Sequence, residues 1–518
     1  MRGKRVSDIL IRGGRVIDGG GGPSRRADVV VREGRIEAVG DFTDSGAELV
    51  LEAAGLVVAP GFIDCHSHSD SDLLEDPLAR PKVAQGVTTE VVGNCGWGPY
   101  GPEEEALGGR GFGSLGEYRA ALKERGTAVN VAALVPDGPV RLSVVGPEDR
   151  AATGEELRGM GVRVREWMGQ GAAGMSFGLL YAPGCFTPTE EIVALARVVG
   201  EFGRPVAFHV RNECDRFAES VAEALAVGRA AGAAVHISHL KVADPEHWGR
   251  VGVVLEQIEE AAARGETVTC DQYPYTAGSA PFETLLPPWS LAGGKQALLG
   301  RLREVSVRER VVRCLEGKEE VEGWDNLSRR IGWERIVVAS APGREAWEGR
   351  SVGEIAAERR EGPAEVLFEL MLVTETKAQG IFHHMCEEDV QAVMRHPAQM
   401  VGSDGLPSSG KPHPRLWGTF PRVLGRYCRE LGLLGLEEAV HKMTGKTALT
   451  FGLEGRGRVA AGGHADLCVF DAERVSDRAT YEDPVRAPEG IVHVICNGVP
   501  TMLDGERTEA RPGEWAVT

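Results

Sequence analysis

The segment PGFIDCHSH (60–68) is the first of eight short apolar runs, and these runs decide the fold. Amphipathic helical patterns lie between them, for instance TEEIVALARVVGEFG (189–203). Such alternation is typical of parallel strands joined by helices, and eight strand–helix units close into a TIM-like (β/α)8 barrel. The runs are PGFIDCHSH (60–68), GVTTEVVGN (86–94), AVNVAALV (128–135), AAGMSFGLL (172–180), PVAFHV (205–210), AAVHISHL (233–240), ETVTCDQYPY (266–275) and QMVGSDG (399–405).

The two ends of the chain differ from this middle part. Short β patterns split by glycines occupy 7–58, and similar patterns return in 457–506. The seventh and eighth runs are separated by residues 276–398, far more than a barrel loop needs. We therefore expect an α/β protein of three parts. They are a small β-sandwich domain built from 1–58 and 451–518, a barrel over 59–450, and an insertion at about 276–398 between strands 7 and 8.

Composition narrows the classes of partner. The 518 residues carry 58 Lys and Arg against 76 Asp and Glu, a formal net charge of −18. This balance argues against nucleic acid and anionic membranes, because phosphate binding needs excess basic charge. There is no run of about 18 apolar residues that could span a bilayer. The opening MRGKRVSDIL lacks the apolar segment of a secretory signal, and ten Cys are too few for a disulfide scaffold. We expect a cytoplasmic protein with reduced thiols.

Metal-binding residue types gather at the ends of the predicted strands. If the barrel forms, these ends meet at one rim, where catalytic residues of such barrels lie. Neutral imidazole and thiolate suit Zn²⁺, and a carboxylate beside the metal can take a proton from water. His236 lies three residues before His239 in the same predicted strand and is the alternative ligand, whereas His383 and His384 are as readily structural as functional. The six candidates are His66, His68, Cys95, His209, His239 and Asp404.

At these residues the sequence resembles the D-aminoacylase (N-acyl-D-amino-acid deacylase) family of the amidohydrolase superfamily. The resemblance covers nearly the whole chain. The motifs that carry it are LIRGGRVIDG (10–19), APGFIDCHSH (59–68), VVGNCG (91–96), ISHLK (237–241), DQYPYTA (271–277), MVGSDGLP (400–407), HPRLWGTFPRVLGRY (413–427), ADLCVFD (465–471) and EGIVHVICNGV (489–499).

The resemblance implies a zinc enzyme that hydrolyses N-acyl-D-amino acids to a carboxylate and a free D-amino acid. Two other enzyme activities remain open, that of an N-acyl-D-Glu or D-Asp deacylase and that of a cyclic-amide hydrolase. The non-enzymatic alternative is a scaffold protein that keeps the barrel but has no activity. The partner is then a small N-acylated D-amino acid, and no oligomeric state is indicated. The same resemblance implies a tight zinc site formed by Cys95, His209 and His239. It implies a weaker second site with His66 and His68, which Cys95 could bridge, and it makes Asp404 the catalytic acid/base. The substrate carboxylate is then held by Lys241, Arg415, Tyr273 (with Tyr275 as rival) and Ser279.

Three positions distinguish this chain from relatives. Gly178 stands where hydantoinase-like relatives carry a metal-bridging Lys, which favours the D-aminoacylase branch. Trp97 and Tyr100 follow Cys95 where small aliphatic residues are common, and we expect them to reshape the acyl pocket.

Overall fold

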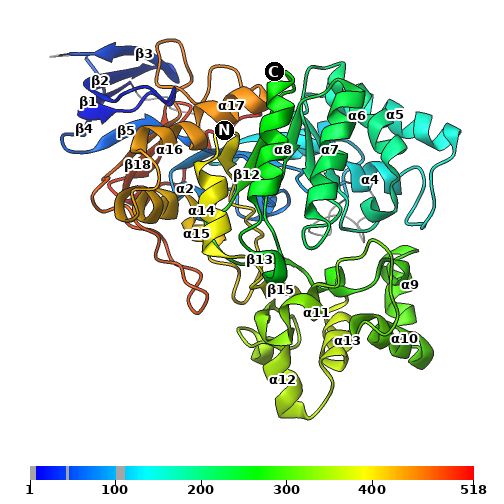
Figure 1. Ribbon diagram of the computed structural model, residues 1–518. Helices are drawn as coiled ribbons and strands as arrows, with labels where there is room; N and C mark the ends of the chain where they lie inside the picture. The colour runs from blue at the N-terminus through cyan, green and yellow to red at the C-terminus, as the bar shows by residue number, and fades with distance from the viewer. Residues whose placement is uncertain (1–7, 43–45, 101–110, 518) are drawn as a thin grey trace.

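The computed structural model describes residues 8–42, 46–100 and 111–517 (Figure 1). Eight parallel strands form its centre. They follow one another in space in the order of the chain, and each pairs in parallel with the next. The strands are β6 (Phe62–Asp64), β7 (Val87–Val92), β8 (Asn130–Pro136), β9 (Gly174–Gly178), β10 (Val206–His209), β11 (Val235–Ile237), β12 (Val268–Gln272) and β16 (Gln399–Val401).

The first and last strands meet just beyond their ends and complete the barrel. Ser67 and Gly405 form a parallel bridge, and the Asp404 N–H donates to the His66 carbonyl at 2.7 Å. The predicted barrel is therefore confirmed. The prediction that His66 and His68 lie on the first strand is wrong, since β6 ends at Asp64 and both histidines lie in the loop that follows.

Buried charges hold this seam. Lys82, which is 1% exposed, lies 2.5 Å from Asp64 Oδ2 and 3.3 Å from Glu90 Oε2. Its ammonium also donates to Ser67 Oγ and Ser403 Oγ. Burial opposes the charge of Lys82, but the two carboxylates raise its pKa above the ordinary value. The network links β6, β7 and the loop after β16, so it fixes the rim at which β6 and β16 end.

Helices surround the barrel, and their starts follow local capping rules. Thr153 forms a reciprocal capping box with Glu156 at the start of α5, and Ser114 caps α3. The barrel helices are α1 (Asp72–Glu75), α2 (Arg80–Val83), α3 (Leu115–Arg125), α4 (Asp137–Leu142), α5 (Gly154–Gly169), α6 (Thr189–Gly200), α7 (Phe217–Ala231), α8 (Gly252–Ala263), α14 (Glu387–Arg395), α15 (Arg415–Arg422), α16 (Leu436–Met443) and α17 (Gly445–Phe451).

Both chain ends contribute to one nine-stranded sheet. The N-terminal and C-terminal segments join where β5 pairs antiparallel with β17. Val29, Val58, Leu467 and Ile495 are fully buried in its own apolar core, so the two ends form one β domain, as predicted. Its strands are β1 (Ile9–Val16), β2 (Arg25–Arg32), β3 (Arg35–Gly40), β4 (Leu49–Glu52), β5 (Val57–Pro60), β17 (Leu467–Phe470), β18 (Ile491–Cys496), β19 (Val499–Leu503) and β20 (Glu506–Arg507).

The long segment between β12 and β16 forms a separate lobe, at the bottom of Figure 1. Phe282, Val366 and Phe368 are fully buried in its own core. Within the predicted range 276–398, α14 packs instead on α8 and β12 of the barrel. The lobe consists of β13 (Gly278–Pro281), β14 (Ile336–Ser340), β15 (Gln379–Phe382), α9 (Gly294–Arg301), α10 (Val305–Leu315), α11 (Leu327–Ile331), α12 (Val352–Arg359) and α13 (Pro363–Thr374).

No helix in the described part of the chain has the length and apolar character needed to cross a membrane. None of the ten cysteines, all of which lie in the described residues, forms a disulfide bond. The expectation about a secretory signal rests mainly on residues 1–7, which lie outside the described residues.

Candidate metal centre and active site

Three residues at the barrel rim adopt a backbone conformation that side chains other than glycine rarely take. The φ angles of Cys95, His239 and Asp404 are 53°, 35° and 48°. Each residue follows the end of a barrel strand, β7, β11 or β16. Such conformations cost of order 1–3 kcal/mol each and persist where the surroundings enforce them, often at functional sites. In all three cases the turn occurs where the strand leaves the barrel.

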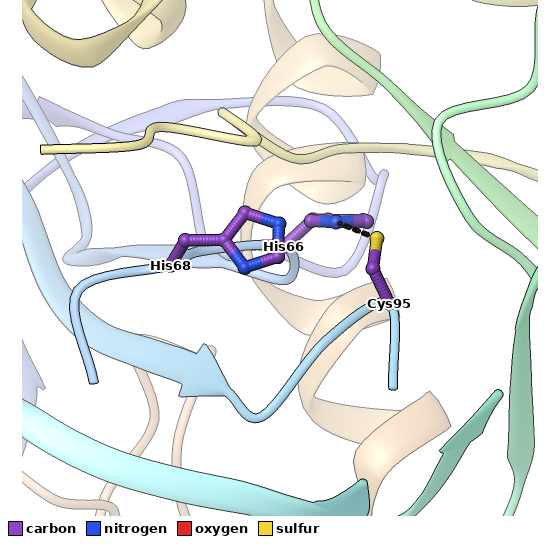
Figure 2. A group of neighbouring side chains, drawn as sticks. All are labelled: His66, His68 and Cys95. Atoms are coloured by element: carbon purple, nitrogen blue, oxygen red, sulfur yellow. Dashed lines mark hydrogen bonds between the residues drawn. The ribbon is translucent and has the colours of Figure 1, made fainter. Parts of the chain in front are cut away.

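The donor atoms of five side chains converge there. Cys95 Sγ lies 3.2 Å from His66 Nε2 and 3.3 Å from His239 Nε2, and Figure 2 shows Cys95 with His66 and His68. Two ligand triplets share the thiol: His66 and His68 with Cys95, and His209 and His239 with Cys95. A tetrahedral zinc ion would separate a sulfur and a nitrogen ligand by about 3.5 Å. The spacing therefore fits two adjacent metal positions with a common sulfur ligand.

His209 provides independent support for a metal. It is 3% exposed, and neither of its ring nitrogens has a hydrogen-bond partner among the described residues. Its ring lies 4.3 Å from that of His239, centroid to centroid. Buried polar groups are normally paired, because an unpaired one costs about 1–3 kcal/mol. A cation beside Cys95 would give one of these two nitrogens a partner.

The electrostatics favour a thiolate at Cys95. Burial alone would raise the pKa of the thiol, but the imidazoles of His66 and His239 hold it well below the ordinary value. The thiolate is the form of cysteine that binds metal.

Asp404 faces the same centre. Its Oδ1 lies 3.1 Å from His68 Nε2 and 3.4 Å from His66 Nε2, and its Oδ2 lies 2.9 Å from an Arg415 guanidinium nitrogen. Burial would raise the pKa of Asp404, but Arg415 and His66 keep it well below its usual range. The side chain is thus an ionised base beside the metal ligands.

Behind the centre lies Asp271, whose role the sequence did not reveal. Its carboxylate holds three histidines in place. Its Oδ2 accepts from His66 Nδ1 at 3.1 Å and from His236 Nε2 at 2.8 Å, and its Oδ1 accepts from the His239 N–H at 3.1 Å. Because an ionised carboxylate only accepts, His66 Nδ1 carries a proton and donates to Asp271, and His66 Nε2 is directed at the centre. His236, the alternative ligand, points to Asp271 and Thr269.

Glu213 is a second pocket residue absent from the predicted set. It follows β10 in the segment RNEC (211–214), which matches no known ligand or catalytic motif, so its role could not be predicted from the sequence. Its Oε1 lies 2.6 Å from Lys241 Nζ and 3.2 Å from His239 Nδ1. Burial would raise its pKa, but Lys241 and the histidines lower it well below the ordinary value. Glu213 therefore neutralises Lys241 and contacts a metal-ligand candidate at once.

The chain also matches known proteins. Residues 49–502 match the sequence model described as "Amidohydrolase family". The chain belongs to this family. It is 40% identical over 516 residues to a D-aminoacylase of Alcaligenes xylosoxydans xylosoxydans, covering 98% of this chain and 96% of that protein. An N-acyl-D-glutamate deacylase of the same organism is 40% identical over 500 residues, covering 95% of this chain and 93% of the relative.

Solved structures agree in fold. The crystal structure of N-acyl-D-glutamate deacylase from Bordetella bronchiseptica, complexed with zinc and a phosphonate inhibitor, superposes with a TM-score of 0.85 at 35% identity. The match covers 99% of this amidohydrolase and all of that chain. A crystal structure of D-aminoacylase gives a TM-score of 0.84 at 37% identity, with coverage of 99% and 100%.

The amidohydrolase pocket opens beside the metal ligands and receives several predicted substrate residues. Lys241, Tyr273 and Ser279 line it, and the Arg415 guanidinium lies 4.4 Å over the Tyr273 ring. Tyr275 does not line it and packs edge-on against His413. Besides Lys241, Tyr273 and Ser279, the lining comprises His68, Trp97, Leu180, Tyr181, His209, Glu213, Cys214, His239, Ala243, Gly278, Ala280, Thr284, Asp325, Leu327, Phe382, His384, Asp404 and Leu406.

The distinguishing positions have separate structural reasons. A Cβ on Gly178 would lie 2.0 Å from the Cys95 carbonyl oxygen, so the loop that presents the cysteine excludes a lysine there. Trp97 lines the pocket and packs on Tyr181 at 4.3 Å. Tyr100 instead lies in the core against Trp167, at 4.9 Å, so the expectation that it shapes the pocket is not borne out.

Proposed function

We propose that this amidohydrolase hydrolyses the amide bond of N-acyl-D-amino acids with the help of zinc. The observation that carries the proposal is one pocket beside the Cys95–His209–His239 triplet, lined by two of its histidines, the ionised Asp404 and the cationic Lys241. Metal ligands, a base and an anion-binding end are the three parts that such a reaction needs.

The donor set supports zinc. Cys95, His209 and His239 are our candidates for a tight site, and His66 and His68 for a weaker second site with Cys95 shared. When bound, zinc would lower the pKa of water and polarise the scissile carbonyl. If Cys95, His209 and His239 held zinc, these three residues would supply one sulfur and two nitrogen ligands, and catalytic zinc sites with three protein ligands bind water or substrate as well.

Asp404 is the proposed acid/base. Its carboxylate takes a proton from the attacking water and later delivers it to the leaving nitrogen. Its Oδ1 lies 3.4 Å from His66 Nε2 and 3.1 Å from His68 Nε2, so the carboxylate stands directly beside these metal-ligand candidates. Arg415 keeps it ionised in the free enzyme.

The substrate carboxylate would bind next to the metal centre, where Arg415 contacts Asp404 and Lys241 contacts His239. Arg415, Lys241, Tyr273 and Ser279 are the proposed contacts. Arginine suits this task because its planar fork forms charge-assisted bonds with carboxylates. With the carboxylate and the carbonyl held at two fixed places, the side chain of the D enantiomer occupies a third, and the L enantiomer would have to exchange two of them.

The residues that line the pocket favour a substrate with an uncharged side chain over N-acyl-D-glutamate or N-acyl-D-aspartate. Among the described lining residues, Lys241 is the one Lys or Arg, and it is paired with Glu213. Asp325 adds a further carboxyl group, and Leu180 and Leu327 are apolar. An acidic side chain would find no free cation to compensate its desolvation.

The test is release of free amine from matched N-acetyl-D- and N-acetyl-L-amino acids. Zinc-loaded protein should hydrolyse N-acetyl-D-leucine or N-acetyl-D-methionine, and a metal-free preparation should not. The L compounds should react poorly, and N-acetyl-D-glutamate should be the weaker D substrate. Zinc-dependent opening of a cyclic amide without turnover of any N-acyl-D-amino acid would overturn the proposal.

A further inference from the structure

Two adjacent histidines lie where the lobe returns to the barrel, and the structure separates their environments. His384 lines the active-site pocket and is 6% exposed. Neither of its ring nitrogens has a hydrogen-bond partner among the described residues. His383 is half-buried, and its ring packs edge-on against Tyr481 at 5.0 Å instead. His384 is therefore the one that faces a ligand.

The backbone holds His384 rigidly. Its carbonyl accepts from Trp248 Nε1 at 3.0 Å, and its N–H donates to the Phe382 carbonyl at 3.1 Å. Opposite the ring, a Cβ on Gly278 would lie 2.8 Å from His384 Nε2 and 3.2 Å from the Tyr273 hydroxyl. The absence of a side chain at Gly278 thus leaves His384 Nε2 and Tyr273 facing the same small space.

The surrounding charges keep the imidazole neutral. Burial, helped by the nearby charge of Lys241 and opposed by Glu213, lowers the pKa of His384 to about 3. A neutral imidazole offers one N–H donor and one acceptor. Leaving both unpaired in a buried site is unfavourable, so a ligand that accepts the N–H gains affinity.

We propose that His384 is a substrate-binding residue that donates a ring N–H to the carboxylate of the bound N-acyl amino acid. Its neighbours Tyr273, Lys241 and Arg415 are the groups proposed above to hold that carboxylate, so the inference rests on the proposed function. The lobe would then supply a residue to the barrel's active site. Since His384 is neutral, it adds a directed donor to the clamp without adding charge.

The experiment compares His384→Phe and His384→Gln with the matched neighbour variant His383→Phe, using zinc-loaded protein and N-acetyl-D-leucine. H384F keeps the ring shape and removes the donor, so KM should rise roughly 10- to 100-fold, as expected for loss of one bond to a charged group. The effect on kcat should be smaller. H384Q places an amide N–H near the position of Nε2 and should recover part of the loss. H383F should match the wild type, and zinc content should be equal in all four proteins.

Three results would overturn the inference. An unchanged KM in H384F would remove the contact. Equal losses in H384F and H384Q would indicate packing rather than donation, and loss of zinc would indicate a role at the metal centre. Calorimetric titration of the wild-type protein with N-acetyl-D-leucine shows whether only the assignment of His384 is wrong or whether the proposed function is wrong as well. A wild-type protein that neither binds nor hydrolyses the compound overturns both, whereas normal wild-type turnover with an unaffected H384F overturns only the assignment of His384.

Discussion

Replacement of Asp271 by Asn should weaken metal binding without removing any metal ligand. The carboxylate accepts three hydrogen bonds, from the rings of His66 and His236 and from the backbone N–H of His239. Asparagine offers only one oxygen. In either orientation of the amide, its NH2 group would face at least one of these donors, so one or two of the three bonds are lost.

The size of the effect follows from those bonds. A hydrogen bond to a charged group contributes about 1.5–3 kcal/mol. At about 1.4 kcal/mol for each tenfold change, loss of one such bond corresponds to a roughly 10- to 100-fold lower zinc affinity. This agrees with the usual effect of removing a group that orients a metal-bound histidine. His236→Phe removes one donor to Asp271 but leaves the bond to His66, so its effect should be smaller.

The assay is zinc titration against a competing chelator, together with kcat/KM at saturating zinc. Asp389→Asn is the matched control, because Asp389 is also a buried carboxylate but accepts from backbone groups at Gly249 and Val251. D389N should bind zinc like the wild type. Zinc affinity of D271N within twofold of the wild type would refute the argument that Asp271 orients the histidines.

Four further outcomes are expected. Asp404→Asn should retain zinc and lower kcat by roughly 100-fold or more, since proton transfer by a positioned side chain contributes that much, and steady-state kinetics with metal analysis checks it. Arg415→Ala should raise KM and also lower kcat, because the guanidinium contacts Asp404 at 2.9 Å; an unchanged KM would sink its assignment to the substrate carboxylate. Lys82→Met should destabilise the protein by about 3–5 kcal/mol, because Asp64 and Glu90 stay buried without their cation. Thermal unfolding should show this as a lower apparent Tm. A Tm equal to that of a control variant with the exposed Lys123 replaced, Lys123→Met, would contradict the prediction. Removal of metal with a chelator should abolish turnover and added zinc should restore it, whereas full activity in the zinc-free protein would exclude a catalytic metal.

Some features were predictable from the chain because they depend on local pattern and on one rule of topology. Alternating strands and helices predict a barrel, and parallel strands gather their carboxyl ends at one rim. His209 ends β10, and Cys95, His239 and Asp404 closely follow their strands, so their convergence could be predicted without coordinates. The resemblance in DQYPYTA favoured Tyr273 over Tyr275, and the lining of the pocket agrees with that order.

The sequence by itself determined the barrel, the terminal β domain and the set of reactive residue types at the rim, because periodicity and strand ends are local properties of the chain. Only the tertiary structure decided which of two adjacent histidines faces the pocket and which carboxylates support the histidines. Asp271 and His66 are 205 residues apart in the chain, and Lys82 and Ser403 are 321 apart. Contacts of this kind depend on how strands and loops close in three dimensions, and a single sequence carries no local signal for them.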